Sequence, residues 1–188
     1  MASSDLVRRS ILVALLFGAV APVSAQEAGV IVPAPAAPVV DLNNGVSFEI
    51  SPHTGVMGGS GIFGLRALMN YGTFTLELAG EQVIGRTANL YPVSVNMILN
   101  LSTRGRLIPY GAVGAGLWLT VPTTTVGDRT VTSLGLNFGG GARYYVSRVF
   151  GFRLEAKQYM TSVTSQREST SELMFFQEVT LGVTFMFH

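Results

Sequence analysis

The chain has 188 residues, of which 48% are hydrophobic and 12% charged, and this length is enough for one domain. It contains no cysteine, which excludes a disulfide framework and a thiolate metal site. Lys and Arg number 12 against 11 Asp and Glu, and this balance argues against nucleic-acid binding, which needs a basic excess.

Residues 1–25 have the pattern of a cleaved signal peptide. Arg8 and Arg9 precede the apolar run 11–20, and the small residues Val23, Ser24 and Ala25 follow it. A membrane-anchoring helix is the alternative, but spanning a bilayer takes about 20 apolar residues, more than this run has. We therefore predict that the mature chain begins near Gln26.

Residues 26–44 are predicted to form an Ala/Pro-rich periplasmic tail. Pro33, Pro35 and Pro38 disfavour both a helix and a strand ladder. We interpret this tail as a spacer, with a binding segment as the less favoured alternative.

Apolar and polar side chains alternate almost without interruption through residues 45–188. This alternation predicts eight strands, at residues 46–57, 61–69, 73–78, 90–101, 107–120, 131–146, 150–161 and 173–187. All but the third are near or above the ~9–11 residues with which a tilted strand crosses a bilayer. We therefore predict an all-β fold, an eight-stranded antiparallel up-and-down transmembrane β-barrel.

The predicted connections alternate in length. Those at 70–72, 102–106 and 147–149 are tight. Longer or more polar connections are predicted at 53–60, 79–89, 121–130 and 162–172. Short turns at one end and longer loops at the other are typical of an outer-membrane barrel, with the turns in the periplasm.

The two faces of the predicted strands differ in charge. One face is apolar, whereas the other carries four acids and four bases, namely Glu49, Arg66, Glu77, Arg143, Arg153, Glu155, Lys157 and Glu178. Charges enclosed in a narrow lumen must be matched, because desolvating a lone ion costs several kcal/mol. Since an eight-stranded barrel is just wide enough for side chains to fill, we predict a salt-bridged, closed lumen. A narrow channel for ions or small solutes is the alternative.

Two details of the strands remain open to more than one interpretation. Arg143 could lie opposite Arg153 or, with a turn at 148–150, opposite Glu155. Like charges that face each other are destabilising, so we predict the pairing with Glu155. In strand 107–120, Tyr110 and Trp118 fall on the inner face. A bulge, or a position of Trp118 at the membrane interface, would explain this.

Several segments together resemble the small outer-membrane β-barrel proteins of the OmpA and OmpX kind. They are Ile108-Pro109-Tyr110-Gly111, Gly114-Ala115-Gly116, residues 137–145 and Gly151-Phe152-Arg153-Leu154-Glu155. The resemblance covers residues 44–188. It implies an outer-membrane location, contact with membrane lipid and lipopolysaccharide, and a monomer.

In this family the last residue is an outward aromatic that the barrel-assembly machinery recognises. Val183, Phe185 and Phe187 follow that pattern here, although His188 comes after them.

Candidate catalytic groups are few. The only histidines are His53 and His188, which excludes a multi-histidine metal site. His53 falls in the predicted first loop, where Asp128 is its only proposed partner and Ser51 and Ser60 are the only nearby serines. We therefore predict no catalytic site, no metal and no cofactor, and a structural or surface-interaction role. A lipid A-modifying enzyme and a soluble periplasmic β-protein are less favoured alternatives.

Overall fold

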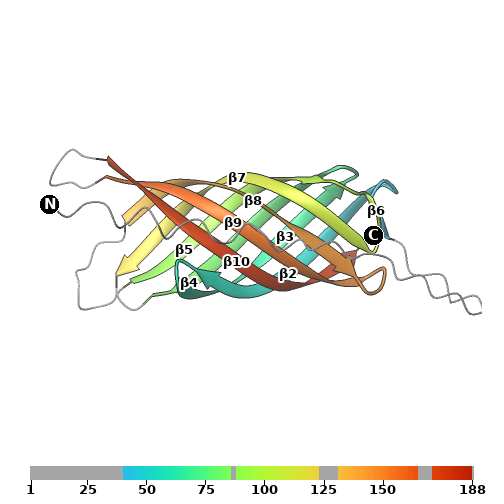
Figure 1. Ribbon diagram of the computed structural model, residues 1–188, viewed down its shortest axis with the longest axis horizontal. Coiled ribbons are helices and arrows are strands. Elements are labelled where there is room, and N and C mark those ends of the chain that lie inside the picture. Colours follow the sequence, from blue (N-terminus) through green and yellow to red (C-terminus); the bar gives the residue numbers. More distant parts are fainter. Residues whose placement is uncertain (1–39, 86–87, 123–130, 165–170, 188) are drawn as a thin grey trace, which may run out of the picture. The chain divides into compact units, whose positions relative to one another are not determined.

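The computed structural model describes residues 40–85, 88–122, 131–164 and 171–187. Eight of its strands close into an antiparallel barrel (Figure 1) in the order β10-β2-β3-β4-β5-β7-β8-β9. The barrel strands are β2 (Val46–Met57), β3 (Ser60–Tyr71), β4 (Phe74–Ile84), β5 (Ala88–Asn100), β7 (Leu107–Pro122), β8 (Val131–Tyr145), β9 (Phe150–Thr164) and β10 (Ser171–Phe187). The predicted fold class is therefore confirmed. Within the described residues, no helix is long and apolar enough to cross a membrane.

Two predicted loops are instead continuations of strands. The first connection is only the turn Gly58-Gly59, since Met57 pairs with Ser60. Both glycines have positive φ, 55° and 84°, which suits the tight turn of a twisted hairpin. The strand predicted at 73–78 is β4, which has 11 residues and ends only at Ile84. The predictions of loops at 53–60 and at 79–89 were therefore wrong over most of their length.

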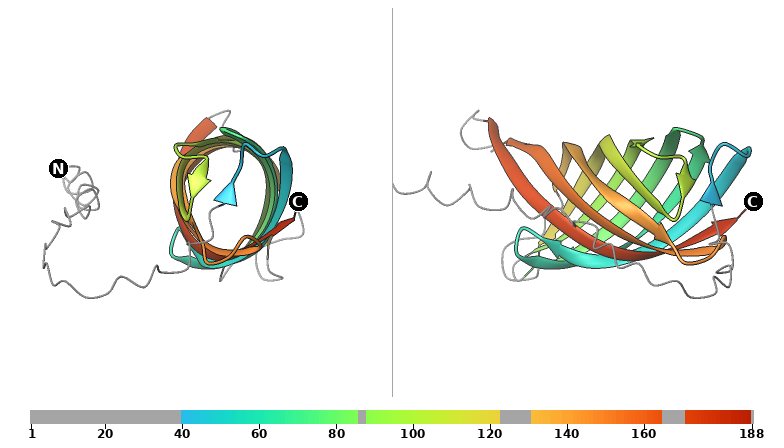
Figure 2. Two further views of the ribbon diagram at one scale, coloured as in Figure 1. Left: turned by 90° about the vertical axis from the view of Figure 1, so that its right-hand side faces the viewer. Right: turned by 45° about the vertical axis from the view of Figure 1, so that its right-hand side comes forward.

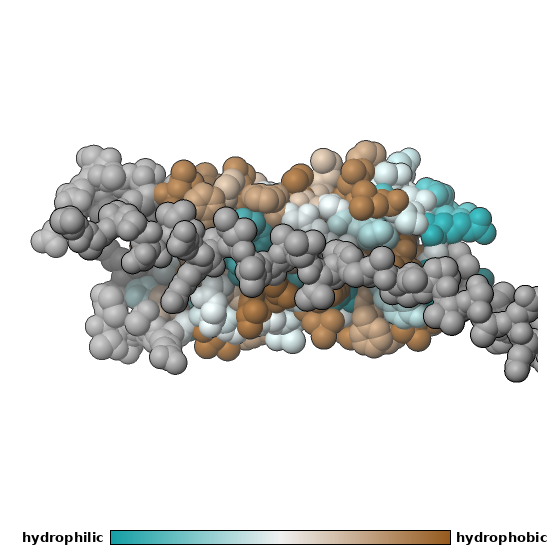
Figure 3. All heavy atoms as spheres, in the orientation of Figure 1, coloured by the Kyte–Doolittle hydropathy of each residue, from teal (hydrophilic) through white to brown (hydrophobic). Residues whose placement is uncertain are grey.

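The outer surface of the barrel is apolar. Large side chains such as Phe48, Leu78, Leu154 and Leu181 expose 54% to 58% of their area there, and Figure 3 shows hydrophobic residues along the wall. The charged side chains of the same strands point inward. This is the reverse of a soluble barrel, in which the apolar face would be the core. The apolar belt makes bilayer hydrocarbon the natural surroundings of the barrel.

The short connections β3–β4, β5–β7 and β8–β9 lie at one end of the barrel, here named the turn end, and the opposite end is named the loop end. At the turn end, β1 (Val40–Asp41) pairs with β6 (Arg104–Gly105), and both lie at the barrel mouth (Figure 2). Leu42 N donates a hydrogen bond of 2.8 Å to Thr103 O. The folded part thus begins by Val40, earlier than the boundary predicted at residue 45.

Candidate functional site in the barrel interior

The structure places all eight charged residues predicted for the lumen in the barrel interior. None of them is more than 3% exposed. They come from β2, β3, β4, β8, β9 and β10, whose side chains alternate between the two faces of the wall. The charges group into two networks.

The first network lies nearer the turn end and joins one acid to one base. Arg143 Nη1 lies 2.7 Å from Glu49 Oε1, and the Tyr145 hydroxyl donates to the same oxygen over 2.8 Å. Asn70 Nδ2 also donates to Glu49, over 2.6 Å, and its Oδ1 accepts from Arg143 over 3.0 Å. Arg143 further donates to Asn100 Oδ1. This buried pair therefore has the additional hydrogen bonds that offset its desolvation.

The second network, here named the central network, joins three bases to four acids. Its members are Arg66, Arg153, Lys157, Glu77, Glu81, Glu155 and Glu178. Arg66 lies 3.0 Å from Glu81 and 2.8 Å from Glu178, and Lys157 lies 3.0 Å from Glu77.

Glu155 makes the most contacts among the carboxylates of the central network. Its carboxylate forms ion pairs with Arg66, Arg153 and Lys157, the last over 2.8 Å, and accepts a hydrogen bond from the Tyr110 hydroxyl. It therefore holds β3, β7 and β9 together across the lumen.

The predicted pairing of Arg143 with Glu155 is wrong. In the β8–β9 register Arg143 lies opposite Arg153, and Glu155 lies opposite Gly141. The two like charges are tolerated because each has its own acid, Glu49 for Arg143 and Glu77 and Glu155 for Arg153. Both guanidinium carbons also face the Tyr110 ring, at 5.5 Å and 4.9 Å from its centroid, within cation–π range.

His53 and Glu81 are interior residues that the sequence analysis assigned to loops. His53 Nε2 lies 3.1 Å from Glu81 Oε1, and both side chains are 1% exposed. His53 is on β2 and Glu81 on β4, so the contact passes over Gly64 of the intervening β3. A Cβ atom at Gly64 would lie 2.8 Å from the imidazole and 2.9 Å from Glu81 Cγ. Glycine at this position therefore lets the two side chains meet.

The sequence contained a signal for both residues. Glu81 keeps the inward parity of Glu77, and His53 keeps that of Glu49, so continuing the alternation would have placed them in the lumen. Asp128, the proposed partner of His53, lies outside the described residues. Among the residues that the structure describes, no group of three histidine or acidic side chains could hold a metal ion.

Counting Glu81, the described interior holds five carboxylates against four Arg and Lys side chains, with His53 beside one carboxylate. The prediction of four acids and four bases missed one carboxylate, that of Glu81. An interior without net charge therefore needs one further proton, on His53 or on a carboxyl group.

Inward glycines make room for the long charged side chains. A Cβ at Gly139 of β8 would lie 2.9 Å from Lys157 Cγ, and one at Gly141 would lie 2.7 Å from the Tyr110 hydroxyl oxygen. In both cases backbone of β9 is closer still, at 2.2 Å. The glycines on this wall thus accommodate the charges of β9 and the ring of Tyr110.

Apolar clusters lie beyond the charges at both ends. At the loop end, Trp118 packs against Tyr159 at 5.2 Å and Phe176 at 5.4 Å between ring centroids, with Met57, Ile62 and Val83 in the same cluster. β7 pairs without interruption on both sides, which excludes a bulge. Trp118 is 3% exposed, which excludes a position at the membrane interface. It points inward, and Gly135 of β8 lies beside its indole.

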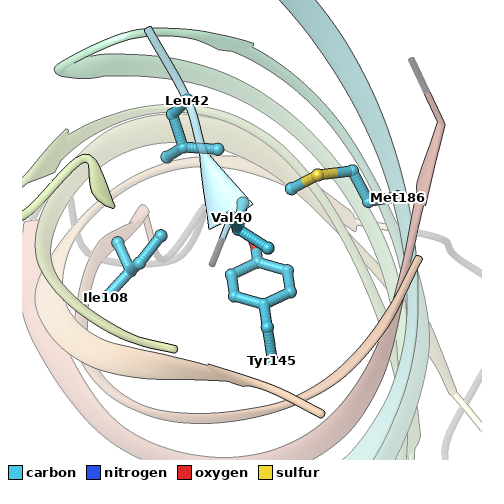
Figure 4. Packing of buried hydrophobic residues seen from close by; sticks show 5 residues of the cluster. All are labelled: Val40, Leu42, Ile108, Tyr145 and Met186. Atoms are coloured by element: carbon cyan, nitrogen blue, oxygen red, sulfur yellow. The ribbon is translucent and has the colours of Figure 1, made fainter. Parts of the chain in front are cut away.

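At the turn end, a second cluster contains Val40 of β1, Leu42 directly after β1, and side chains from the wall. Figure 4 shows Val40 and Leu42 reaching Ile108, Tyr145 and Met186, and all five are at most 3% exposed. Tyr145 also donates its hydroxyl to Glu49, so this cluster, here named the strap cluster, adjoins the first charge network.

The predicted assembly signal lies at the end of β10. Phe185 and Phe187 are 41% and 51% exposed on the outer surface, and Val183 shares their parity. Phe185 pairs with Ile50 and Phe187 with Phe48, where β10 closes the barrel against β2. His188 lies outside the described residues.

No protein-family model matches the chain, and neither does any curated protein sequence. Solved structures do match. The N-terminal barrel domain of Pseudomonas aeruginosa OprF superposes with a TM-score of 0.61 at 16% identity, over 75% of this chain and 97% of that one. Neisserial surface protein A gives 0.58 at 15% identity, over 76% and 96%. A major outer membrane protein of Thermus thermophilus gives 0.53 at 10% identity, over 77% and 100%.

This chain has the fold of the small outer-membrane β-barrels. The apolar belt, the polar interior and the even number of strands of this outer-membrane barrel all agree with that fold. Because the sequence identities are low, the likeness extends to the fold and not to the activity of any one of these proteins.

Proposed function

We propose that the protein is a monomeric outer-membrane barrel with a closed lumen and a structural or surface-interaction role. The observation that carries this proposal is the layering of the interior. Paired charges fill the middle, the cluster of Trp118 lies toward the loop end, and the strap cluster lies toward the turn end. These three layers of side chains follow one another along the lumen, which favours a closed barrel over a pore.

Its proposed partners are outer-membrane lipid and lipopolysaccharide and, during assembly, the barrel-assembly machinery through Val183, Phe185 and Phe187. The outward position of Phe185 and Phe187 at the closing seam supports the last of these. We infer no catalytic role for His53, since its ring lies inside the wall against Glu81 and not in a loop open to substrate.

The test is the conductance of the refolded mature chain, residues 26–188, in a planar bilayer. We expect no discrete current steps over a range of salt concentrations, with insertion verified independently by protease protection. Reproducible steps from the unaltered protein would show that the lumen conducts and would end the closed-lumen proposal.

A gated narrow channel is the second candidate. It is favoured by one observation: part of the strap cluster comes from β1, which is not a strand of the barrel wall. The segment could leave without breaking any ladder of the closed sheet. In the same bilayer, a V40S/L42S variant distinguishes the two candidates. Current steps from this variant, but not from the unaltered protein, would favour a channel that the strap cluster closes. If neither protein gives current steps, the paired charges are the barrier.

A further inference from the structure

The charged side chains that the structure describes outside the lumen lie at one end of the barrel. Among the side chains that the structure describes, every charged group outside the interior lies at the turn end. These groups are Asp41, Arg104, Arg106 and Arg148. Figure 3 shows the most hydrophilic described surface at its right-hand end, where Figure 1 labels β6. These four residues are here named the turn-end rim. With three bases and one acid, the rim has an excess of two positive charges.

The arginines come from neighbouring parts of the rim. Arg104 is in β6, where its Nε lies 4.0 Å from Asp41 of β1. Arg106 immediately precedes β7, and its carbonyl oxygen accepts a hydrogen bond of 2.7 Å from Tyr145 N at the end of β8. Arg148 is three residues further along, in the turn between β8 and β9.

Among the described residues, Arg104 alone of the three arginines contacts a carboxylate, that of Asp41. The Arg104 side chain is 75% exposed despite its contact with Asp41, and Arg148 is exposed. Arg106 Nε is buried and makes no hydrogen bond to any part of the chain that the structure describes. The rim therefore has guanidinium groups free to bind an anion.

The apolar belt ends directly beside these arginines. Leu107 is 56% exposed, and Val146 and Val149, on either side of Arg148 in the turn, are 47% and 56% exposed. Tyr144, 44% exposed, is the kind of residue that lies at the edge of the hydrocarbon. With the aliphatic side chains in acyl chains, the guanidinium groups lie at the level of the lipid phosphates.

We infer that the turn-end rim, through Arg104, Arg106 and Arg148, is a binding surface for anionic phospholipid headgroups in the leaflet that it faces. The arginines bind the phosphate, and Leu107, Val146 and Val149 contact the acyl chains of the same lipids. A net negative lipid is favoured over a zwitterionic one because the rim carries a positive excess. The inference rests on the barrel's spanning a membrane and is independent of whether the lumen conducts.

The test is native mass spectrometry of the detergent-purified mature protein with equal amounts of phosphatidylglycerol and phosphatidylethanolamine. We expect phosphatidylglycerol to be retained at least about threefold more. An R104Q/R106Q/R148Q variant is expected to lose this preference, and R104K/R106K/R148K to retain most of it. The charge-matched control R86Q/R129Q/R167Q alters the connections β4–β5, β7–β8 and β9–β10, and is expected to keep the preference.

Several outcomes would overturn the inference. One is an unchanged preference in the glutamine variant, and another is an equal loss in the control, which would indicate a response to net charge alone. Glycerol 3-phosphate at the same concentration is the third arm. If it binds the rim as well as the lipid does, the surface is a soluble-phosphate site and not a lipid site. Circular dichroism verifies folding, and R148Q, a single change in an exposed turn, tests the inference should the triple variant not fold.

Discussion

At the scale of single residues, the interior is organised around a few side chains with many partners. Glu155 contacts three cations and a tyrosine hydroxyl, whereas the described contacts of Glu178 are with Arg66 alone. Removing one partner from a buried ionic network is costly because it leaves charges desolvated and unpaired. The cost should therefore follow the number of partners lost.

Replacing Glu155 by glutamine is expected to lower the free energy of unfolding by about 3–5 kcal/mol. The matched change Glu178→Gln should cost less, about 1–3 kcal/mol, because it removes one carboxylate from an interior that has more acids than Arg and Lys. Urea unfolding of the two variants in lipid vesicles measures both values. Equal losses of unfolding free energy would contradict the expectation that the cost follows the number of partners lost.

Two glycines of neighbouring strands offer a second comparison. Gly64 faces inward between His53 and Glu81, whereas a Cβ at Gly80 would have no atom within 4 Å. We expect Gly64→Ala to destabilise the barrel by about 1–3 kcal/mol through overpacking, and Gly80→Ala to be neutral or slightly stabilising. The same unfolding measurement applies. Tolerance of alanine at Gly64 would show that the His53–Glu81 contact does not depend on that space.

At the scale of elements, β1 shows that a short segment next to a barrel can belong to its core. β1 has only two residues. The side chains of Val40 and of Leu42, which follows β1, are nevertheless buried against wall residues of β7, β8 and β10. Proline and alanine content favoured a spacer over a binding segment for residues 26–44. That composition contains no information on whether a nearby barrel mouth can receive two aliphatic side chains.

Replacing Leu42 by alanine is therefore expected to cost about 2–5 kcal/mol, as for other buried leucines. Leu101 is the matched control, because it is also a leucine near the turn end but is 70% exposed. Leu101→Ala should change the unfolding free energy little. If both substitutions had the same small effect, the strap cluster would contribute nothing to stability.

At the scale of the whole molecule, the position in the bilayer follows from the distribution of exposed apolar side chains. Leu154 lies in the apolar belt of β9, between Phe152 and Ala156, whereas Val146 lies where the belt meets the rim arginines. The energy of a charge on the lipid face depends strongly on its depth.

Leu154→Arg is expected to destabilise the barrel by about 2–4 kcal/mol in vesicles, and Val146→Arg by about 0–1 kcal/mol. Unfolding with guanidinium chloride in lipid vesicles measures the difference in unfolding free energy between the two variants. Repeating the pair in detergent micelles is the control, because a micelle adapts its thickness and the difference should shrink. A larger cost at Val146 would mean that the membrane boundary has been placed wrongly.

The sequence by itself determined the class of fold, the number of strands and the face on which each of the eight predicted charges lies. These follow from the two-residue period of a strand, which is a local property and can be counted along the chain. The sequence analysis missed His53 and Glu81 as lumen residues because it interpreted the polar residues near these connections as loops.

Only the tertiary structure decided which charges meet. Arg66 contacts Glu155, which is 89 residues away in sequence, and Arg143 contacts Glu49, which is 94 residues away. Such pairs depend on how the sheet closes and on the register of every hairpin, so neighbours in one hairpin do not predict them. Arg143 and Arg153 could lie opposite each other because acids from other strands, Glu49 and Glu77, reach them across the lumen.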